Sequence, residues 1–514
     1  MPPLRSFLTT PFFPALMLLS AAAPRPAAAQ IAAASRAVET RTPLVAAPSA
    51  SRAALAPFDV SPLAAPSIAL PAPLSAPALA APAAATAALP PRRAPPAAIR
   101  PAADSAPNGE PAAAVLSRVA LLKNPDESFD ARAQMFASAG DSIDAGYFEF
   151  SPDETGLTKL ALLRAAARRG LKVRLMLDGY GSTLPKALVR HMVDEGVDVR
   201  IYHPLRSLHA SWLWRRSHDK WTVVDGREMI VGDSNMADKF FGRGPDPWRS
   251  REIHVSGPAA AQGRAYVDGM WRSGEVRRPR GLDKVAPEAA AAAGRLVDAH
   301  DRPAPAADAP RPWAERAADA VVRFTHNNFL RPHRSGGIGL ELLDMIRSAE
   351  KTVVIENAYL VFPKIFRDEL ERAVRERGVR VVIITNSLET NNLPYVRYAY
   401  EADRDRLVRM GVELYEFKGP GTLHAKGMVV DGRRAYLGSF NLNPWAFMFN
   451  TETGVIVDGH EAVANDLLRR MEATRLESSM VGRYGEWAFP QPRRAAMILR
   501  RALLSLPRRL LLGD

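Results

Sequence analysis

The feature that most constrains the fold of this chain is a polar motif that occurs twice. Each copy has the spacing H-x-K-x-x-x-x-D, followed at matching offsets by a glycine and an asparagine. The two sets are His218, Lys220, Asp225, Gly232 and Asn235, and then His424, Lys426, Asp431, Gly438 and Asn441. One match of this kind can arise by chance, but two with the same downstream residues indicate an internal duplication. We therefore expect two halves of similar structure.

The segments around the two copies predict the same order of strands and helices. In the first half, apolar patterning predicts strands over 142–150, 171–177, 197–202, 220–224 and 228–231, with helices over 157–169 and 185–195. In the second half, strands are expected over 352–355, 379–385, 412–417, 428–430 and 435–437, with helices over 338–350, 364–377 and 398–410. Strands that alternate with helices form a parallel or mixed sheet covered by helices, so the expected fold class is α/β.

Composition divides the chain into segments. Two halves, 114–286 and 319–480, carry the duplicated pattern, and an inter-domain linker is expected over 287–318. Arg5, an apolar run over 12–20 and Ala27–Ala29 are typical of an export signal over 1–29, and the alternative is an Ala/Pro-rich start without that role. Recurrent prolines forbid a continuous helix over 30–113, which is interpreted as an extended, disordered linker.

The charge of the chain suits an anionic partner. Lysine and arginine number 68 against 55 acids, a net charge of +13, which fits either nucleic acid or an acidic membrane surface. In the last segment, 481–514, arginine pairs at 493–494 and 500–501 fall on one helical face beside apolar residues. Such a basic amphipathic tail is typical of binding to an anionic bilayer, and the alternative is a helix that packs on the protein itself. The absence of cysteine excludes disulfides and thiolate metal sites.

The repeated motif has the composition of a site for phosphoryl chemistry. A histidine and a lysine two residues apart on a strand point to the same face. Two copies would supply two imidazoles, two ammonium groups and two amides, from His218, His424, Lys220, Lys426, Asn235 and Asn441. Such a site stabilises charge on a phosphoryl group, while one imidazole attacks phosphorus and the other protonates the leaving alkoxide. Because the lysines neutralise the phosphate, no metal or cofactor is expected.

The acidic residues near the motif have open roles. Asp225 and Asp431 each precede a glycine where a hairpin turns, so a turn role and a direct catalytic role are both alternatives. An imidazole also needs a partner that fixes its tautomer. Glu252 and Glu452, each at the start of the strand after its motif, are the better-placed candidates. Ser439, within the second G-S-x-N, completes the candidate catalytic set.

With these residues, the chain resembles the phospholipase D superfamily, which is marked by the duplicated H-x-K-x-x-x-x-D motif. Four segments are similar to bacterial cardiolipin synthases of the C type: 232–242, 379–394, 411–417 and 423–458. The resemblance implies two pseudo-symmetric α/β/α halves, each a mixed sheet flanked by helices, that share one active site. It also implies a phosphohistidine intermediate, with His218 as nucleophile and His424 as general acid, although the residues alone do not order the two.

The same resemblance implies a reaction and a location. The expected reaction transfers a phosphatidyl group from a phospholipid to an alcohol such as phosphatidylglycerol. Phosphatidylglycerol, phosphatidylethanolamine and cardiolipin are the expected lipids, and an anionic membrane surface is the expected partner. The alternatives are a phospholipase D-type hydrolase or a nuclease and, in another class, a catalytically silent protein that binds anionic lipid. With the export signal, the protein is expected beyond the inner membrane, associated with its periplasmic face or secreted.

Several positions depart from the family pattern. Asp233 follows Gly232 where the family prefers glycine or serine, and a carboxylate there would repel a phosphate unless it points away or pairs with a cation. Ser250 stands where the family tends to carry an acid, and the loop around Tyr359 differs in a way that bears on acceptor choice. Three tryptophans lie near the first motif in the sequence: Trp212, Trp214 and Trp221. They are consistent either with an apolar entrance for acyl chains or with positions in the core.

Overall fold

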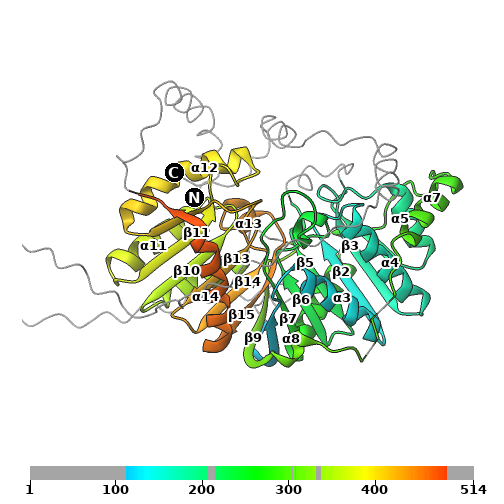
Figure 1. Ribbon diagram of the computed structural model, residues 1–514, viewed down its shortest axis with the longest axis horizontal. Coiled ribbons are helices and arrows are strands. Elements are labelled where there is room, and N and C mark those ends of the chain that lie inside the picture. The colour runs from blue at the N-terminus through cyan, green and yellow to red at the C-terminus, as the bar shows by residue number, and fades with distance from the viewer. Residues whose placement is uncertain (1–111, 205–214, 304, 307, 331–336, 483–514) are drawn as a thin grey trace, which may run out of the picture.

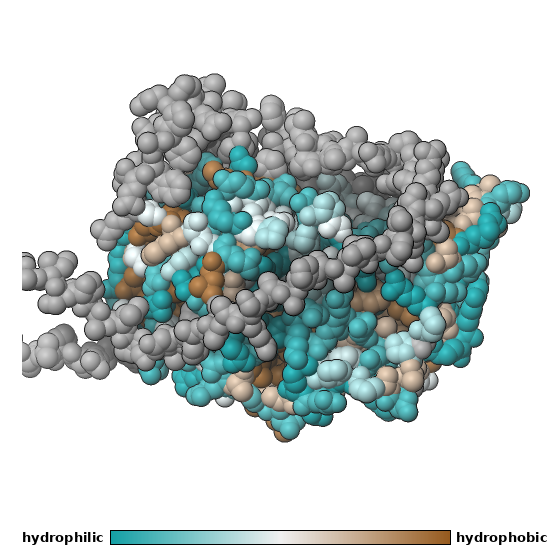
Figure 2. All heavy atoms as spheres, in the orientation of Figure 1, coloured by the Kyte–Doolittle hydropathy of each residue, from teal (hydrophilic) through white to brown (hydrophobic). Residues whose placement is uncertain are grey.

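A computed structural model of the chain describes residues 112–204, 215–303, 305–306, 308–330 and 337–482 (Figure 1). The expected export signal, nearly all of the Ala/Pro-rich linker and of the C-terminal tail, and two of the tryptophans, Trp212 and Trp214, lie outside these residues. In the view of Figure 2, the described surface is mostly hydrophilic, with hydrophobic residues in smaller areas between. Among the described helices, none has the length and apolar character needed to cross a membrane.

The described strands of both halves join in a single sheet of 16 strands. The first half contributes β1 (Val115–Leu121), β2 (Ser142–Tyr147), β3 (Lys172–Asp178), β4 (Asp198–Tyr202), β5 (Lys220–Val224), β6 (Glu228–Gly232), β7 (Glu252–Ser256) and β8 (Val276–Arg277). The second half contributes β9 (Ala318–His326), β10 (Thr352–Asn357), β11 (Arg380–Asn386), β12 (Glu413–Phe417), β13 (Lys426–Val430), β14 (Arg434–Gly438), β15 (Thr453–Asp458) and β16 (Ser478–Met480).

Strand pairing repeats between the halves. β2 pairs parallel with β3 and antiparallel with β5, and β10 pairs parallel with β11 and antiparallel with β13 in the same way. The hairpin β5–β6 corresponds to β13–β14, and each hairpin is followed by an antiparallel strand, β7 or β15. The sheet order places β1 and β9 side by side at the centre, where they pair antiparallel. Figure 1 shows the two halves on either side of β9. The predicted α/β class with two similar halves is confirmed.

Helices cover both faces of the sheet. The first half contains α3 (Pro125–Ser138), α4 (Glu154–Arg168), α5 (Lys186–Asp194), the 3₁₀ helix η3 (Asp238–Phe241), α6 (Pro258–Arg272), α7 (Pro287–Asp298) and α8 (Pro312–Glu315). The second half contains α10 (Gly337–Arg347), α11 (Lys364–Arg375), α12 (Pro394–Met410), α13 (Pro444–Met448) and α14 (Glu461–Leu476). The segment expected as a linker, 287–318, thus contains α7, which packs on α5 because Leu296 and Val297 are buried against the first half.

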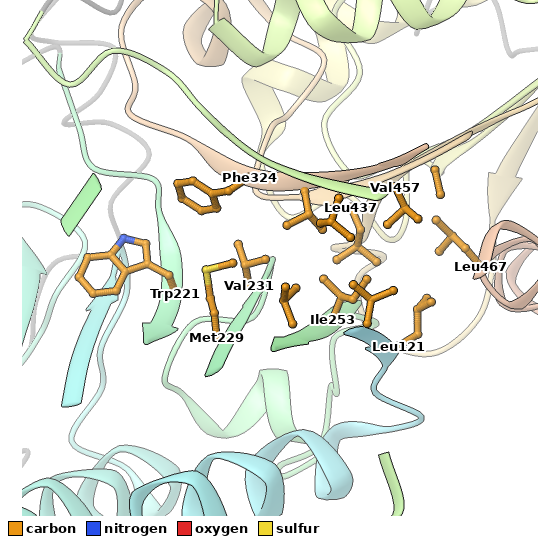
Figure 3. Close-up of a cluster of buried hydrophobic side chains, with 14 of the residues drawn as sticks. Leu121, Trp221, Met229, Val231, Ile253, Phe324, Leu437, Val457 and Leu467 are labelled. Carbon is orange, nitrogen blue, oxygen red and sulfur yellow. The ribbon is translucent and has the colours of Figure 1, made fainter. Parts of the chain in front are cut away.

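One hydrophobic core spans the two halves. On one face of the sheet, Met229, Val231 and Ile253 of the first half share a cluster with residues of the second half (Figure 3), namely Phe324, Leu437, Val457 and Leu467. α6 and α14 contribute to this cluster. Trp221 also belongs to it, so this tryptophan is a core residue rather than part of an entrance. Burial of this shared face couples the folding of the halves.

Candidate active site

Each H-x-K segment is held by the opposite half of the molecule. The histidine lies two residues before its strand, and the residue before the histidine forms a parallel bridge across the halves: Ser217 with Thr451, and Leu423 with Arg249. The backbone amide of His218 donates to the Thr451 carbonyl at 3.0 Å, and that of His424 to the Arg249 carbonyl at 2.8 Å. The two motifs, far apart in sequence, are therefore brought to one place at the junction of the halves.

A carboxylate of the second half fixes the imidazole of the first. Nδ1 of His218 lies 2.9 Å from Oε2 of Glu452. The Ser439 hydroxyl donates to the same Oε2 at 2.5 Å, and the Asn450 amide donates to Oε1 at 3.3 Å. Glu452 itself is completely buried. The acid predicted as an imidazole partner thus contacts the histidine of the other motif, and Ser439 orients that acid.

The two lysines are buried beside the histidines. The ammonium group of Lys220 donates to the backbone carbonyl of His218, and that of Lys426 donates to the carbonyl of His424. Burial lowers the pKa of Lys220 to about 8 and that of Lys426 to about 7, while Glu452 and Asp233 act against both shifts. Each lysine therefore holds its proton only weakly and gains from an incoming anion, as a site for a phosphate group requires.

Both imidazoles are kept neutral at neutral pH. Burial lowers the pKa of His218 and of His424 well below the usual value, and Lys220 and Lys426 lower both further. His218 also lowers the pKa of His424. These mutual effects across the halves define one site rather than two. The side chain of His218 is 12% exposed and that of His424 is 4% exposed, so the first imidazole is the more accessible.

The second imidazole has different neighbours from the first. Its Nδ1 lies 3.6 Å from Oδ1 of Asp233. Three aromatic rings surround it, with centroids 5.0, 5.1 and 6.1 Å away, from Phe240, Trp248 and Tyr359. Among the described residues, the ring that faces His218 is that of Phe148, at 5.4 Å. The two halves of the site are therefore chemically unequal.

The motif aspartates do not reach the imidazoles. Asp225 and Asp431 follow the last residues of β5 and β13, at the opposite ends of these strands from Lys220 and Lys426. Their φ angles of 53° and 52° are those of a tight turn. Each carboxylate accepts three backbone amides from the start of a neighbouring strand: Gly140, Asp141 and Ser142 for the first, and Glu350, Lys351 and Thr352 for the second. Their place among the catalytic candidates is corrected to a structural one.

Glu252 also has a structural role. Its carboxylate forms a buried ion pair with Arg132 of α3 and accepts the Ser128 hydroxyl. The register explains why: Gly232 pairs with Glu252, whereas Gly438 pairs with Gly454. Glu252 thus corresponds to Gly454, and the position equivalent to Glu452 is Ser250. The prediction that Glu252 orients an imidazole is wrong for this reason.

The motif asparagines and glycines flank the site. Oδ1 of Asn235 accepts the Glu149 amide at 3.0 Å, which leaves the amide hydrogens of Asn235 as donors. Oδ1 of Asn441 is buried without a hydrogen-bond partner among the described residues. A Cβ atom at Gly232 or Gly438 would lie 2.4 or 2.5 Å from a carbonyl of the adjacent strand, so glycine is required for this close approach.

Sequence reasoning missed the residues that anchor the two H-x-K segments. Asp178, at the end of β3, accepts the Ser217 amide at 2.8 Å, and Asn386, at the end of β11, accepts the Leu423 amide at 2.9 Å. Asp219, between His218 and Lys220 in sequence, accepts the hydroxyls of Thr451 and Tyr266, each at 2.8 Å. The sequence does contain a signal for Asp178 and Asn386, because each is a polar residue at the end of a buried strand.

The duplicated fold and the paired motifs define a phospholipase D-like class, in which two halves build one active site. A family profile described as "Cardiolipin synthase, PLD-like domain" matches residues 133–244 and 342–474. The chain is 30% identical over 358 residues to cardiolipin synthase B of Salmonella typhi, covering 69% of this chain and 79% of that protein. It therefore belongs to this family and is an enzyme of the phospholipase D superfamily.

A second relative and one solved structure are also similar to this chain. Cardiolipin synthase C of Escherichia coli (strain K12) is 27% identical over 418 residues, which cover 71% of this chain and 86% of that protein. Among solved structures, the phosphatidylserine synthase of Haemophilus influenzae Rd KW20 aligns with a TM-score of 0.61 at 16% identity, over 79% of this chain and 97% of that chain. At this identity the structural match speaks for the fold.

Proposed function

We propose that the protein is a phosphatidyltransferase that acts on phospholipid phosphodiesters through a phosphohistidine intermediate. The observation that carries the proposal is the meeting of both motif histidines in one site, with Glu452 on Nδ1 of His218 and a buried lysine beside each imidazole. The names of the relatives, cardiolipin synthase and phosphatidylserine synthase, support a phospholipid as the substrate.

The proposed first step is an attack by His218 on phosphorus. Because Nδ1 is engaged by Glu452, Nε2 is the ring nitrogen that attacks. The N–P bond forms, the P–O bond to the leaving alcohol breaks, and His424 gives its proton to the leaving alkoxide. Lys220 and Lys426 neutralise the non-bridging oxygens as charge builds on them. The arriving phosphodiester raises the pKa of His424, which is otherwise held low by burial and the lysines, so this imidazole gains its proton with the substrate.

The second step transfers the phosphatidyl group. The acceptor hydroxyl gives its proton to His424 and attacks phosphorus, the N–P bond breaks, and His218 is released. With phosphatidylglycerol as donor and acceptor, the products are cardiolipin and glycerol. With water as acceptor, the same chemistry is phospholipase D hydrolysis, and with a nucleic acid as donor it is a nuclease. The positive charge of the chain, +13, also suits a nucleic acid backbone, so this alternative is tested directly.

The protein is further proposed to work at an anionic membrane after export. The support is in the sequence: the charge, apolar run and small residues over 1–29, and the arginine pairs of the tail over 481–514. Removal of the tail is expected to weaken binding to phosphatidylglycerol vesicles. Binding to neutral phosphatidylcholine vesicles is expected to stay unchanged. Co-sedimentation measures both.

The function is tested with radiolabelled phosphatidylglycerol in vesicles, with and without phosphatidylethanolamine, and separately with plasmid DNA. We expect cardiolipin from the wild type and none from His218→Ala or His424→Ala. His300→Ala is the matched control, because this histidine caps the end of α7 with its ring on the Leu296 carbonyl. DNA cleavage without lipid turnover would overturn the proposal in favour of a nuclease, and lipid binding without turnover would favour a silent binding protein.

A further inference from the structure

The two halves of the site place their acid and their hydroxyl in opposite order. Gly232 and Gly438 are equivalent, because each ends the second strand of the hairpin in its half and pairs with the strand that follows. Two backbone hydrogen bonds show the same register. The Asp233 amide donates to the Arg251 carbonyl, and the Ser439 amide donates to the Thr453 carbonyl in the same way. Position 233 therefore corresponds to 439. Since positions 251 and 453 correspond, position 250 corresponds to 452.

The cross-half bridges give the same correspondence independently. Arg249 pairs with the segment that leads into His424, and Thr451 pairs with the segment that leads into His218. The residue after each is then equivalent, which again aligns Ser250 with Glu452. In the second half the hydroxyl is at 439 and the acid at 452, whereas in the first half the acid is at 233 and the hydroxyl at 250. Each half therefore contains one acid and one hydroxyl at these two positions, but in the opposite order.

The geometry around His424 matches this exchange. Nδ1 of His424 is buried without a hydrogen-bond partner among the described residues, and the atom it faces is Oδ1 of Asp233 at 3.6 Å. The Ser250 hydroxyl oxygen is also buried and has no hydrogen-bond partner in the part of the chain that the structure describes, and this side chain favours the charged form of Asp233. Asp233 and Ser250 therefore lie on the side of His424 that corresponds to the position of Glu452 and Ser439 beside His218, although the hydrogen bonds of 2.9 and 2.5 Å at Glu452 have no equivalent at Asp233 within the described ranges.

Asp233 is firmly held in this place. It is completely buried, the Arg251 amide donates to both of its oxygens at 3.2 Å, and the Lys426 amide donates to Oδ2 at 3.2 Å. Burial raises the pKa of Asp233 to about 7, and the Lys426 ammonium is the largest influence in favour of its charged form. The nearby ammonium therefore offsets part of the charge of this carboxylate, which reduces its repulsion of a phosphate. Glu252, whose charge also raises the pKa of Asp233, forms an ion pair with Arg132.

We propose that Asp233 is the positioning residue of His424, whose Nδ1–H it accepts, and that it performs from position 233 the role that Glu452 performs for His218 from position 452. The 3.6 Å separation closes to a hydrogen bond by a small rotation of the ring or carboxylate. Nε2 of His424 is then directed at the leaving and attacking oxygens. This catalytic consequence rests on the function proposed above, whereas the tautomer of His424 does not.

The test moves the acid between the two positions. The variants are Asp233→Asn, Asp233→Ser, Ser250→Glu, and the double variant Asp233→Ser/Ser250→Glu, which gives the first half the arrangement of the second. Glu452→Gln serves as the matched variant for the other imidazole. Melting temperatures and circular dichroism check that each full-length variant folds, and Asp233→Asn, which preserves shape, keeps the test available where Asp233→Ser does not fold.

Two readouts are used. In protein labelled with ¹⁵N-histidine, with His424 assigned from a His424→Gln variant, we expect the Nδ1–H tautomer in the wild type, a mixture in Asp233→Asn, and recovery in the double variant. In steady-state turnover of phosphatidylglycerol, Asp233→Asn and Asp233→Ser are expected to lower kcat by roughly 10²–10⁴-fold with KM little changed. The double variant is expected to recover at least tenfold over Asp233→Ser.

The outcomes separate this inference from the proposed function. The role of Asp233 would be overturned if Asp233→Asn kept both the His424 tautomer and the kcat of the wild type. It would also be overturned if the double variant were no better than Asp233→Ser in the tautomer or in kcat. An absence of lipid turnover in the wild type would overturn the proposed function, and the tautomer of His424 in Asp233→Asn would still decide the role of Asp233.

Discussion

His218 and His424 occupy equivalent places in their halves but differ in what surrounds them. The first is more exposed and is hydrogen-bonded to Glu452. Within the described part of the chain, it faces the ring of Phe148, whereas the second lies among the rings of Phe240, Trp248 and Tyr359. The accessible imidazole with an engaged Nδ1 suits a nucleophile. The enclosed imidazole, whose pKa is lowered by burial and by the lysines, suits the residue that gains and returns a proton in the proposed cycle.

The assignment of roles predicts a dependence on the leaving group. A phosphatidyl ester of p-nitrophenol has a leaving group that needs no protonation, so its release does not require a general acid. We expect His424→Ala to lose roughly 10²–10⁴-fold in kcat on phosphatidylglycerol and much less in the p-nitrophenol burst. His218→Ala is expected to lose both the turnover of phosphatidylglycerol and the p-nitrophenol burst. Stopped-flow absorbance measures the burst, and equal losses in both variants on both substrates would contradict the assignment.

The lysines predict how affinity depends on pH. The pKa values of Lys426 and Lys220 in the free enzyme are about 7 and about 8, and a bound phosphodiester raises them. As pH rises through this range, the free enzyme loses protons that the complex retains, so affinity falls, by up to about tenfold per unit for each lysine. Calorimetric titration of a short-chain phosphonate analogue from pH 6.5 to 9, in buffers of different ionisation enthalpy, should detect proton uptake. A constant affinity would contradict this.

At the scale of elements, α3 is joined to β7 by a buried ion pair. Both side chains of Arg132 and Glu252 are at most 1% exposed, so removal of one leaves the other charged and unpaired. We expect Arg132→Met to lower the free energy of unfolding by about 3–5 kcal/mol, and the double variant Arg132→Met/Glu252→Leu to recover most of it. Urea unfolding measures both. If Glu252 oriented an imidazole, the double variant would instead lose activity far beyond its loss of stability.

The hairpins β5–β6 and β13–β14 are anchored by Asp225 and Asp431. Burial raises the pKa of Asp225, but the three backbone amides that it accepts outweigh burial and lower it. A carboxyl whose folded pKa is lowered stabilises the protein above its unfolded pKa, and this contribution is lost as pH falls through the folded value.

We expect Asp225→Asn, which tolerates the positive φ, to lower the free energy of unfolding at pH 7 by about 1–2 kcal/mol, with a smaller deficit below pH 4. Because the carboxylate lies at the far end of β5 from Lys220, kcat at low temperature should be retained. Urea unfolding at several pH values and turnover at 15 °C check this, and a large loss of kcat in a stable variant would restore the catalytic alternative.

The limits of the sequence appear most clearly at the acids. Local patterns in the sequence predict the order of the strands and the two turns at the motif aspartates, and the structure contains both. Glu252 and Glu452 each stand at the start of the strand after their motif, which predicts equivalent roles. The segment from Gly232 to its partner on β7 is longer than the one from Gly438 to its partner on β15, however, so the two acids are not equivalent in register. Correspondence between the halves depends on strand pairing, and a single sequence does not contain that information.

At the scale of the whole molecule, the halves are joined at β1 and β9, by the shared core and by the two bridges at the motifs. A half on its own would expose the face of the sheet shown in Figure 3 and would lack the partner that holds its histidine. We therefore expect residues 112–303 or 308–482 expressed alone to aggregate and to be inactive, and their co-expression to restore turnover in part. Size-exclusion chromatography and the lipid assay measure this; turnover by a single monomeric half would contradict it.

The exchange of Asp233 and Ser250 relative to Ser439 and Glu452 has an evolutionary consequence. In an assembly of two identical chains, any substitution near one imidazole also changes the other, so both histidines must share one environment. Fusion of the halves into one chain removes that constraint. The acid beside the second imidazole can then move to a new strand while the first keeps its own, and one histidine can be tuned for attack and the other for proton transfer by separate mutations.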